Sequence, residues 1–379
     1  MVLNDEQVIK HLFGEIREEY IFKETHKLPS LEIEHKTPKE MVEYLDRFVI
    51  GQEEAKKALA VAVSSHYRRI EAGVEDVKIP KSNVLIQGPT GSGKTYILKL
   101  LANLMDVPFC IVDASLITEA AYKGKDLESV ITELYQSAGE DKEKAEKGII
   151  YMDEFDKLSS RFGPENGERT VGAGVQRQML KMIEGCTMEV PESGYKMQGS
   201  SITINTENIL FICGGAFVGI EKVKDKKKYP IGFCTNFEEA ALEEENNEKL
   251  TAKDFVDYGL IPEVVGRLPI IVKLEELKEK ELLDILIKSE DSLIKNYTEL
   301  FKKTYNVELK FTDSAIEEIA HQAAIRKTGA RGLNAMVEVL MQDLLFEVPS
   351  NPNIRGCYIT KEVVQGSGKP RMIYEGLER

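Results

Sequence analysis

The feature that most constrains the fold of this chain is a glycine-rich octapeptide between an apolar run, residues 84–86, and a segment with helical spacing of apolar residues. Such a loop between a strand and a helix is typical of phosphate binding, because its glycines let backbone N–H groups turn toward the phosphates. Lys94 would reach the β- and γ-phosphates, and the Thr95 hydroxyl would hold Mg²⁺. A simple glycine turn is the alternative, which the full motif and both flanks disfavour. The predicted nucleotide contacts are Gly88, Pro89, Thr90, Gly91, Ser92, Gly93, Lys94 and Thr95.

A second motif bears on hydrolysis as opposed to binding alone. Residues 148–152 are mostly apolar, as in a buried strand, and two adjacent carboxylates, Asp153 and Glu154, follow directly. Asp153 would hold the Mg²⁺, and Glu154 would activate the attacking water as a general base. The alternative is an acidic strand end that caps a helix. Since the guanine-reading pattern Asn-Lys-x-Asp does not occur, the two motifs together favour an ATPase over a GTPase.

Four short apolar runs alternate with helical patterns in the first two thirds of the chain. These runs span residues 84–86, 109–112, 149–152 and 209–213. Strands that alternate with helices predict a doubly wound α/β fold with a parallel sheet. Thr37, Pro38 and Glu40 supply an N-cap, a first-turn proline and an acidic first turn, so we expect a helix to begin there.

Beyond about residue 277 the pattern changes to amphipathic helices. Apolar residues repeat at helical spacing in residues 282–287, 315–323 and 333–344. Short strand-like pieces occur at residues 307–311 and 357–359. The predicted domains are an N-terminal segment or linker (1–36), a doubly wound α/β large domain (37–276) and a small, mostly helical C-terminal domain (277–379).

Composition and charge argue against several classes of function. The net charge of −14 has the wrong sign for nucleic-acid binding, which requires a cationic face. No apolar run approaches the roughly 18–20 residues that cross a bilayer, and the polar N-terminus lacks the features of a targeting peptide. The five cysteines include no CxxC pair and the five histidines are scattered, so no disulfide framework or structural metal site is expected. We expect a cytoplasmic protein that binds neither nucleic acid nor membranes.

Several strings of the sequence resemble those of the ClpX family of AAA+ ATPases. They are residues 44–57, 82–95, 116–120, 174–176, 183–185, 209–217 and 327–333. The resemblance runs from about Thr37 to the C-terminus, and it implies a homohexameric ring with ATP bound between subunits. It also implies that Val49 and Ile50 pack on the adenine. The family's zinc-binding N-terminal module, which has two CxxC pairs, has no counterpart in this sequence.

The resemblance further implies roles for two arginines. Arg267 would be the finger that one subunit presents to its neighbour's γ-phosphate. Arg331 would be the second sensor, which contacts the nucleotide of its own subunit and couples hydrolysis to rotation of the small domain. A lone arginine is more often a surface or ion-pair residue, so both roles depend on the resemblance. The first sensor is not assigned, because the corresponding segment reads Cys213, Gly214 and Gly215.

Three loops correspond to loops that handle substrate in the family. Tyr122 keeps the aromatic residue of the Gly-Tyr-Val-Gly pore loop, whereas Ala121 and Lys123 replace its first glycine and its valine. Residues 161–173 match a second channel loop, and residues 195–197 read Tyr-Lys-Met where the family's entrance loop has Arg-Lys-His character. We expect Tyr122 and Lys123 to contact the translocated polypeptide.

A tripeptide, Ile231, Gly232 and Phe233, matches the one that the family docks into clefts of the peptidase ClpP. The chain carries no Gly-x-Ser-x-Gly motif and no evident catalytic triad, so cleavage would come from that partner. We therefore predict an ATP-dependent unfoldase and translocase, with ATP and Mg²⁺ as cofactors, that threads unfolded or tagged proteins through a hexameric pore into a ClpP-type peptidase.

Three alternative functions stay open at this point. An HslU-like unfoldase would carry an inserted helical domain, for which this chain is short. A stand-alone remodelling chaperone would hydrolyse ATP without a peptidase. A nucleotide-gated scaffold would bind and hydrolyse ATP but thread no protein.

Overall fold

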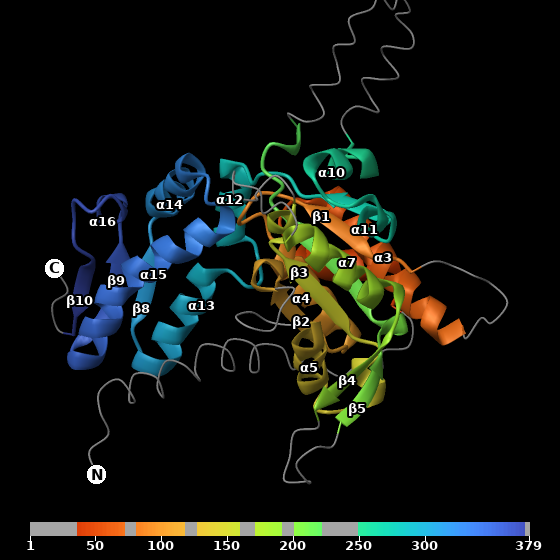
Figure 1. The fold of residues 1–379 in the computed structure, drawn as a ribbon. Helices are drawn as coiled ribbons and strands as arrows, with labels where there is room; N and C mark the ends of the chain where they lie inside the picture. Colours follow the sequence, from red (N-terminus) through yellow and green to blue (C-terminus); the bar gives the residue numbers. More distant parts are fainter. Residues whose placement is uncertain are drawn as a thin grey trace, which may run out of the picture. The chain divides into compact units, whose positions relative to one another are not determined.

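Five parallel strands form the central sheet (Figure 1). The computed structural model describes residues 36–72, 81–117, 127–159, 171–191, 201–221 and 249–375. The strands are β1 (Val84–Gln87), β2 (Phe109–Asp113), β3 (Ile149–Asp153), β6 (Leu210–Gly215) and β7 (Ile270–Lys273). Their order across the sheet is β2-β3-β6-β1-β7, with every neighbouring pair parallel. The carboxyl ends of β1 and β3, where the two sequence motifs lie, therefore share one edge of the sheet.

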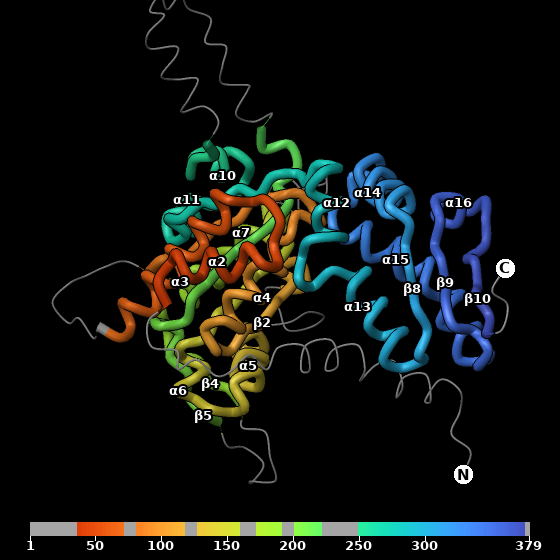
Figure 2. Tube along the Cα trace, turned by 180° about the vertical axis from the view of Figure 1, so that it is seen from behind, coloured from red at the N-terminus to blue at the C-terminus, as the bar shows by residue number. Residues whose placement is uncertain are grey.

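Helices cover both faces of this sheet, which confirms the predicted doubly wound α/β fold. Successive residues of a strand point to opposite faces, so Val84 and Ile86 pack in one core cluster and Leu85 in another. The first cluster includes residues of α2 (Pro38–Phe48), α3 (Glu53–Ala72) and α4 (Lys94–Met105). The second includes residues of α5 (Leu127–Ser137), α7 (Val171–Glu184), α10 (Ala252–Tyr258) and α11 (Pro262–Gly266). Figure 1 views the face that carries α7, and Figure 2 views the opposite face, with α2 in front.

Short elements complete this large lobe. They are η1 (Ala114–Leu116), α6 (Lys142–Ala145), η2 (Phe155–Leu158), the antiparallel strands β4 (Thr187–Pro191) and β5 (Ser201–Asn205), and η4 (Thr206–Asn208).

The predicted helix start at Thr37 is confirmed by the capping of α2. The Thr37 side chain accepts a hydrogen bond from the Glu40 backbone N–H, and the Glu40 carboxylate accepts one from Thr37 N at 2.6 Å. Pro38 occupies the first turn, where its missing N–H costs nothing. This reciprocal capping box fixes the point at which the described chain enters the large lobe.

The C-terminal lobe, residues 277–375, has its own hydrophobic core, which includes Leu277. Its helices are α12 (Glu279–Ile287), α13 (Leu293–Leu300), α14 (Asp313–Arg326), α15 (Gly329–Glu347) and α16 (Lys361–Val364), with short turns η5 (Phe301–Tyr305) and η6 (Val348–Ser350). Its strands are β8 (Glu308–Phe311), β9 (Ile354–Ile359) and β10 (Arg371–Tyr374), in the order β10-β9-β8. The two strand-like pieces noted in the sequence are thus β8 and part of β9, and they pair in parallel.

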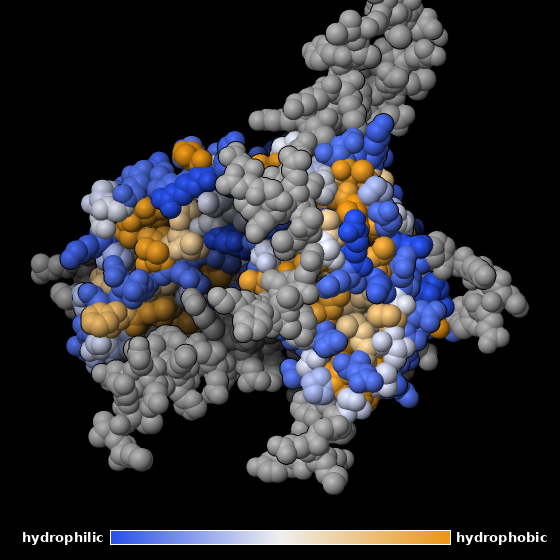
Figure 3. Space-filling model, viewed as in Figure 1, coloured by the Kyte–Doolittle hydropathy of each residue, from blue (hydrophilic) through white to orange (hydrophobic). Residues whose placement is uncertain are grey.

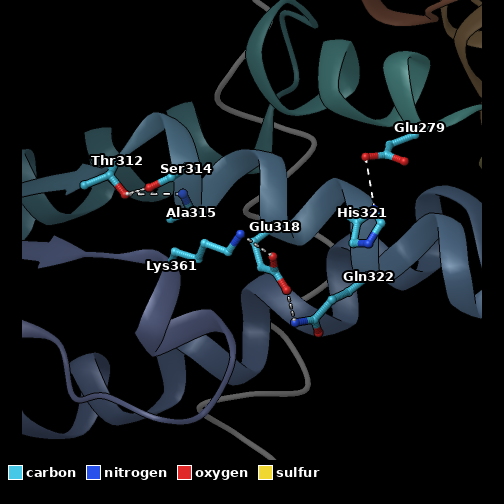
Figure 4. Close-up of polar contacts among 8 residues, drawn as sticks. All are labelled: Glu279, Thr312, Ser314, Ala315, Glu318, His321, Gln322 and Lys361. Carbon is cyan, nitrogen blue, oxygen red and sulfur yellow. Dashed lines mark hydrogen bonds and ion pairs between the residues drawn. The ribbon is translucent and has the colours of Figure 1, made fainter.

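Polar contacts of α14 tie this lobe together at its surface (Figure 4). His321 lies 3.2 Å from the Glu279 carboxylate at the start of α12, and Lys361 at the start of α16 lies 3.3 Å from Glu318. Glu318 also accepts a hydrogen bond from Gln322, one turn further along α14. These contacts connect α14 to α12 and α16.

Hydrogen bonds at the end of α2 join the large and C-terminal lobes. The end of α2 bonds to the segment after α12, through a bidentate Arg47–Glu290 pair at 2.8 and 2.8 Å and through Ser289 Oγ, which donates to Phe48 O at 2.9 Å. Within the large lobe, the Gln52 amide makes reciprocal bonds of 2.8 and 2.9 Å with the backbone of Glu275, just before the C-terminal lobe begins. The large lobe is therefore connected to the C-terminal lobe through the end of α2, and the segment that leads into the C-terminal lobe is fixed to the large lobe.

Among the described residues, no helix has the length and apolar character needed to cross a membrane. The face seen in Figure 3 mixes hydrophilic and hydrophobic residues. Cys110 and Cys213 are buried in strands, as expected for small apolar side chains, and both are free thiols.

Candidate nucleotide site

The phosphate loop leaves β1 and leads directly into α4, which begins at Lys94. Gly91 and Gly93 have φ values of 80° and 99°, a left-handed conformation that glycine adopts without steric cost. The Gly88 N–H donates to Gly215 O at 3.2 Å, which anchors the start of the loop to the end of β6. The sequence thus folds here as the motif predicts: a glycine turn that ends at the N-terminus of a 12-residue helix.

The groups gathered in this loop fit a polyphosphate. The Lys94 ammonium lies within the loop, where it donates to Gly88 O at 2.6 Å and Pro89 O at 3.0 Å. Burial lowers the pKa of Lys94, and the nearby carboxylate of Asp153 opposes this shift. The buried Ser92 hydroxyl has no hydrogen-bond partner among the described residues. A buried cation, an unpartnered hydroxyl and a helix N-terminus are the donors that a phosphate group requires.

The two carboxylates end β3 at the same edge of the sheet. Asp153 Oδ1 accepts hydrogen bonds from the Tyr151 hydroxyl at 3.0 Å and from Glu154 N at 2.9 Å. Glu154 is exposed and has a left-handed φ of 54°. A non-glycine residue with this conformation is uncommon, and such strain is concentrated at functional sites.

Tyr151 is a residue that sequence reasoning missed. Its buried hydroxyl donates a hydrogen bond to Asp153 and lies near the Thr95 side chain, so it neighbours both residues that would hold Mg²⁺. Burial raises the pKa of Tyr151, with Asp153 adding to the rise, so the hydroxyl keeps its proton.

The glycines of β6 explain how Tyr151 fits there. A Cβ on Gly214 would lie 2.5 Å from the Tyr151 hydroxyl oxygen, and a Cβ on Gly215 would lie 2.4 Å from the buried Asp156 carboxylate. Both positions therefore exclude a side chain. The Gly-Gly pair at the end of a strand was the only sequence signal for this arrangement.

Arg331 enters the site from the C-terminal lobe. It is exposed on the first turn of α15, and its positive charge contributes to the lowered pKa of Lys94. The start of α15 touches the phosphate loop directly, because Ala330 N donates to Gly91 O at 3.0 Å. A Cβ on Gly329 would lie 2.5 Å from that oxygen, so this contact requires glycine.

The residues predicted to pack on adenine lie in the turn between α2 and α3. Val49 is 7% exposed and packs in the core with α2, α3 and α4, while Ile50 is half-buried. The next residues, Gly51 and Gln52, have φ values of 69° and 61°. A cavity of about 670 Å³ lies beside this turn. Its lining includes Gln52, Ala55, Leu277 and Ala324.

Arg267 follows α11 and is exposed. Its guanidinium is paired with Glu184 at the end of α7, at 2.7 Å, and its backbone oxygen accepts a hydrogen bond from the buried Asn83 amide at 3.1 Å. Neither partner stood out in the sequence.

The remaining predicted site residues lie outside the described residues. They are Tyr122 and Lys123 of the pore loop, most of the second channel loop, the entrance loop at 195–197, and Ile231, Gly232 and Phe233 of the docking tripeptide.

Comparison with known proteins bears on the class and the family. A family model described as an AAA domain (Cdc48 subfamily) matches residues 79–271, and one for the C-terminal, D2-small domain of ClpB protein matches residues 277–359. With the parallel sheet and phosphate loop described above, the first match defines an AAA+ ATPase, an enzyme that binds nucleotide.

Three curated relatives carry the name ATP-dependent Clp protease ATP-binding subunit ClpX. Those of Borrelia duttonii and Borrelia recurrentis are each 43% identical over 90% of this chain and 81% of their own length. The relative from Treponema denticola is 46% identical over 89% of this chain and 83% of its own length. The chain belongs to the ClpX family.

Proposed function

We propose that this chain is an ATP-driven protein unfoldase that works as a homohexamer in the cytoplasm and delivers proteins to a ClpP-type peptidase. One observation carries the proposal. The phosphate loop with Lys94 follows β1, and Asp153 and Glu154 follow β3 of the same parallel sheet, in a chain that is 43–46% identical to ATP-binding subunits of the Clp protease. That identity extends over 89–90% of the chain, so it includes both lobes.

Each residue of the nucleotide site has a proposed role. The phosphate loop and Lys94 would bind the phosphates of ATP, and Thr95 and Asp153 would hold Mg²⁺. The metal would supply neutralisation of phosphate charge. Glu154 would accept a proton from the attacking water. Arg267 would act on the neighbouring subunit's nucleotide, and Arg331 on that of its own subunit.

Substrate handling is proposed from the sequence alone. Tyr122 and Lys123 would contact the polypeptide in the central channel, and residues 231–233 would dock on the peptidase. In a hexamer, Lys123 would add six cations to the channel, which favours acidic stretches of substrate.

The catalytic assignment is tested by Glu154→Gln. The amide keeps the size of the side chain but removes the base, so ATP should still bind while turnover falls by about 10² or more. Binding is measured with a fluorescent ATP analogue and turnover by phosphate release. Unchanged turnover would remove Glu154 from the catalytic role.

The partner assignment is tested by degradation of a tagged, stable fluorescent protein with ClpP and ATP. Loss of fluorescence with the wild type but not with Phe233→Ala supports docking through the tripeptide. Unfolding without any ClpP dependence would favour a stand-alone chaperone. ATP hydrolysis without unfolding would favour the nucleotide-gated scaffold.

A further inference from the structure

Among the described residues, the Arg267 guanidinium contacts one carboxylate, that of Glu184. Arg267 Nε donates to Glu184 Oε1 at 2.8 Å, and Nη2 lies 2.7 Å from the same oxygen. A guanidinium carries five N–H groups, and these two contacts use only one of its edges. The side chain of Arg267 is 57% exposed. Nη1 is therefore outside this ion pair, and more than half of the side-chain surface is open to solvent.

Both members of the pair are fixed by the segment that leads into β1. The Lys81 ammonium donates to Ile183 O at 3.1 Å, which holds the last turn of α7 and with it Glu184. The Asn83 amide donates to Arg267 O at 3.1 Å, and Asn83 is only 2% exposed. The backbones beside Glu184 and at Arg267 are thus both attached to residues 81–83, which leaves the Arg267 side chain to be oriented.

A contribution to the stability of the folded chain does not by itself explain why Arg267 and Glu184 are paired. An exposed ion pair contributes little to folding, and an acidic side chain at the C-terminal end of a helix is disfavoured by the helix dipole. Orientation gives a better reason, because arginine is long and flexible, and a carboxylate on one edge of its fork fixes the direction of the other edge.

We propose that Glu184 is a positioning residue that aims Arg267 at the nucleotide of the neighbouring subunit. This inference rests on the proposed function, in which Arg267 acts in trans. A guanidinium that is already oriented loses less freedom when it meets a developing negative charge, so the pair raises the rate of hydrolysis without contributing to ATP binding in its own subunit.

The first test replaces Glu184 with Gln and uses Glu299→Gln as the matched control. Glu299 is also an exposed carboxylate paired with a cation, Lys303 at 2.7 Å, but it lies on α13. Glu184→Gln should lower kcat for ATP about tenfold with little change in KM, because a loosened side chain forfeits part of the effect of an arginine finger. Glu299→Gln should leave both unchanged. Adding Glu184→Gln to Arg267→Ala should cause no further loss.

A second test uses mixed rings, because a finger acts on the neighbour. Glu154→Gln subunits have an inactive site of their own but an intact Arg267. Mixing them with Glu184→Gln subunits should raise turnover per Glu184→Gln subunit several-fold, since many of those sites then face an intact finger. Absence of this rescue would mean that Glu184 acts within its own subunit, and would overturn the proposal.

A third test needs neither nucleotide nor assembly. The Arg267 guanidinium should react faster with an arginine-specific dicarbonyl reagent in Glu184→Gln than in the wild type, as measured by peptide mass spectrometry; equal rates would contradict the pairing. Glu184→Asp, which keeps the charge, should behave between the two. If Arg267→Ala keeps full ATPase activity, Arg267 has no role in trans, and the proposed function fails. If Arg267→Ala loses ATPase activity but Glu184→Gln hydrolyses ATP at the wild-type rate, only the positioning role of Glu184 fails.

Discussion

His66 is a fully buried histidine on α3 whose surroundings disfavour its charged form. Its Nε2 lies 3.0 Å from Asn208 O, and its buried Nδ1 has no hydrogen-bond partner among the described residues. Burial lowers its pKa to about 3, and the positive charges of Arg69 and Lys81 add to this shift. His66 therefore stays neutral in the folded protein well below the pH at which it is protonated in an unfolded chain.

The lowered pKa of His66 predicts acid destabilisation in a defined window. Between pH 6.5 and about 3 the unfolded state binds a proton that the folded state does not, so stability falls as the pH falls through this range. The loss from this residue at pH 5, relative to pH 8, should be about 2 kcal/mol. Urea unfolding of wild type and His66→Gln at both pH values measures it. An equal pH dependence in the two proteins would contradict the assignment.

At the scale of elements, the start of α15 rests on the phosphate loop through backbone atoms. Ala330 N donates to Gly91 O, and the close approach of Gly329 leaves no room for a side chain at either glycine. Displacement of α15 would move Arg331 and disturb the loop together. The contact therefore links the two parts of the site that come from different lobes.

Gly329→Ala should weaken nucleotide binding. Its Cβ would lie 2.5 Å from Gly91 O, an overlap that forces the helix and loop apart. We expect the Kd for a fluorescent ATP analogue to rise about tenfold or more, since overpacking of this kind costs about 1–3 kcal/mol.

Gly139→Ala is the matched control for this variant. Gly139 also has a positive φ, of 69°, but a Cβ there meets nothing within 4 Å. It carries the same conformational cost without the contact, and its Kd should stay at the wild-type value. Similar Kd values for the two variants would show that the contact is unimportant for binding.

The strands that sequence reasoning found were those with continuous apolar runs. The runs at residues 84–86, 109–112 and 149–152 are β1, β2 and β3, each of which extends one residue further, and residues 209–213 correspond to β6. The strand β7 (Ile270–Lys273) was missed although its apolar run is as long as that of β1, because it directly follows Pro269, a residue more typical of turns and loops. The pairing of β9 with β10 depends on contacts within the C-terminal lobe that spacing along the chain does not reveal.

The residues of the candidate site also fall into two groups, those that the sequence alone indicates and those that only the structure reveals. Lys94, Asp153 and Glu154 lie in contiguous motifs whose spacing reflects the chemistry of ATP, so the sequence alone indicates them. Asn83 and Glu184 both contact Arg267, which lies far from them along the chain, and only the folded structure brings these residues together. Tyr151 is hydrogen-bonded to nearby Asp153, but its place beside the glycines of β6 likewise depends on the fold.

At the scale of the whole molecule, the Arg47–Glu290 pair is the charged connection between the end of α2 and the segment after α12. It is bidentate, with both bonds at 2.8 Å, and the two side chains are 41% and 40% exposed. Its geometry is favourable, but solvent screens its charges. A modest contribution to stability follows.

A double-mutant cycle measures that contribution. Arg47→Glu and Glu290→Arg should each destabilise the protein, and the double variant should recover most of the loss, with a coupling energy of about 0.2–1 kcal/mol. The coupling should decrease in 1 M salt, where charges are screened over about 3 Å. Thermal unfolding at two salt concentrations provides the data. No recovery in the double variant would mean that the pair does not join the lobes.

Tyr151, which neighbours the proposed Mg²⁺ ligands, has a consequence for repeated ATP turnover. Because the buried Tyr151 hydroxyl is hydrogen-bonded to Asp153 and lies near Thr95, it helps to fix the positions of both side chains. Mg²⁺ would then bind to side chains that are already oriented, and these side chains would keep their orientation after it leaves. An ATPase that releases and rebinds its nucleotide in each cycle would not have to reorient these side chains each time.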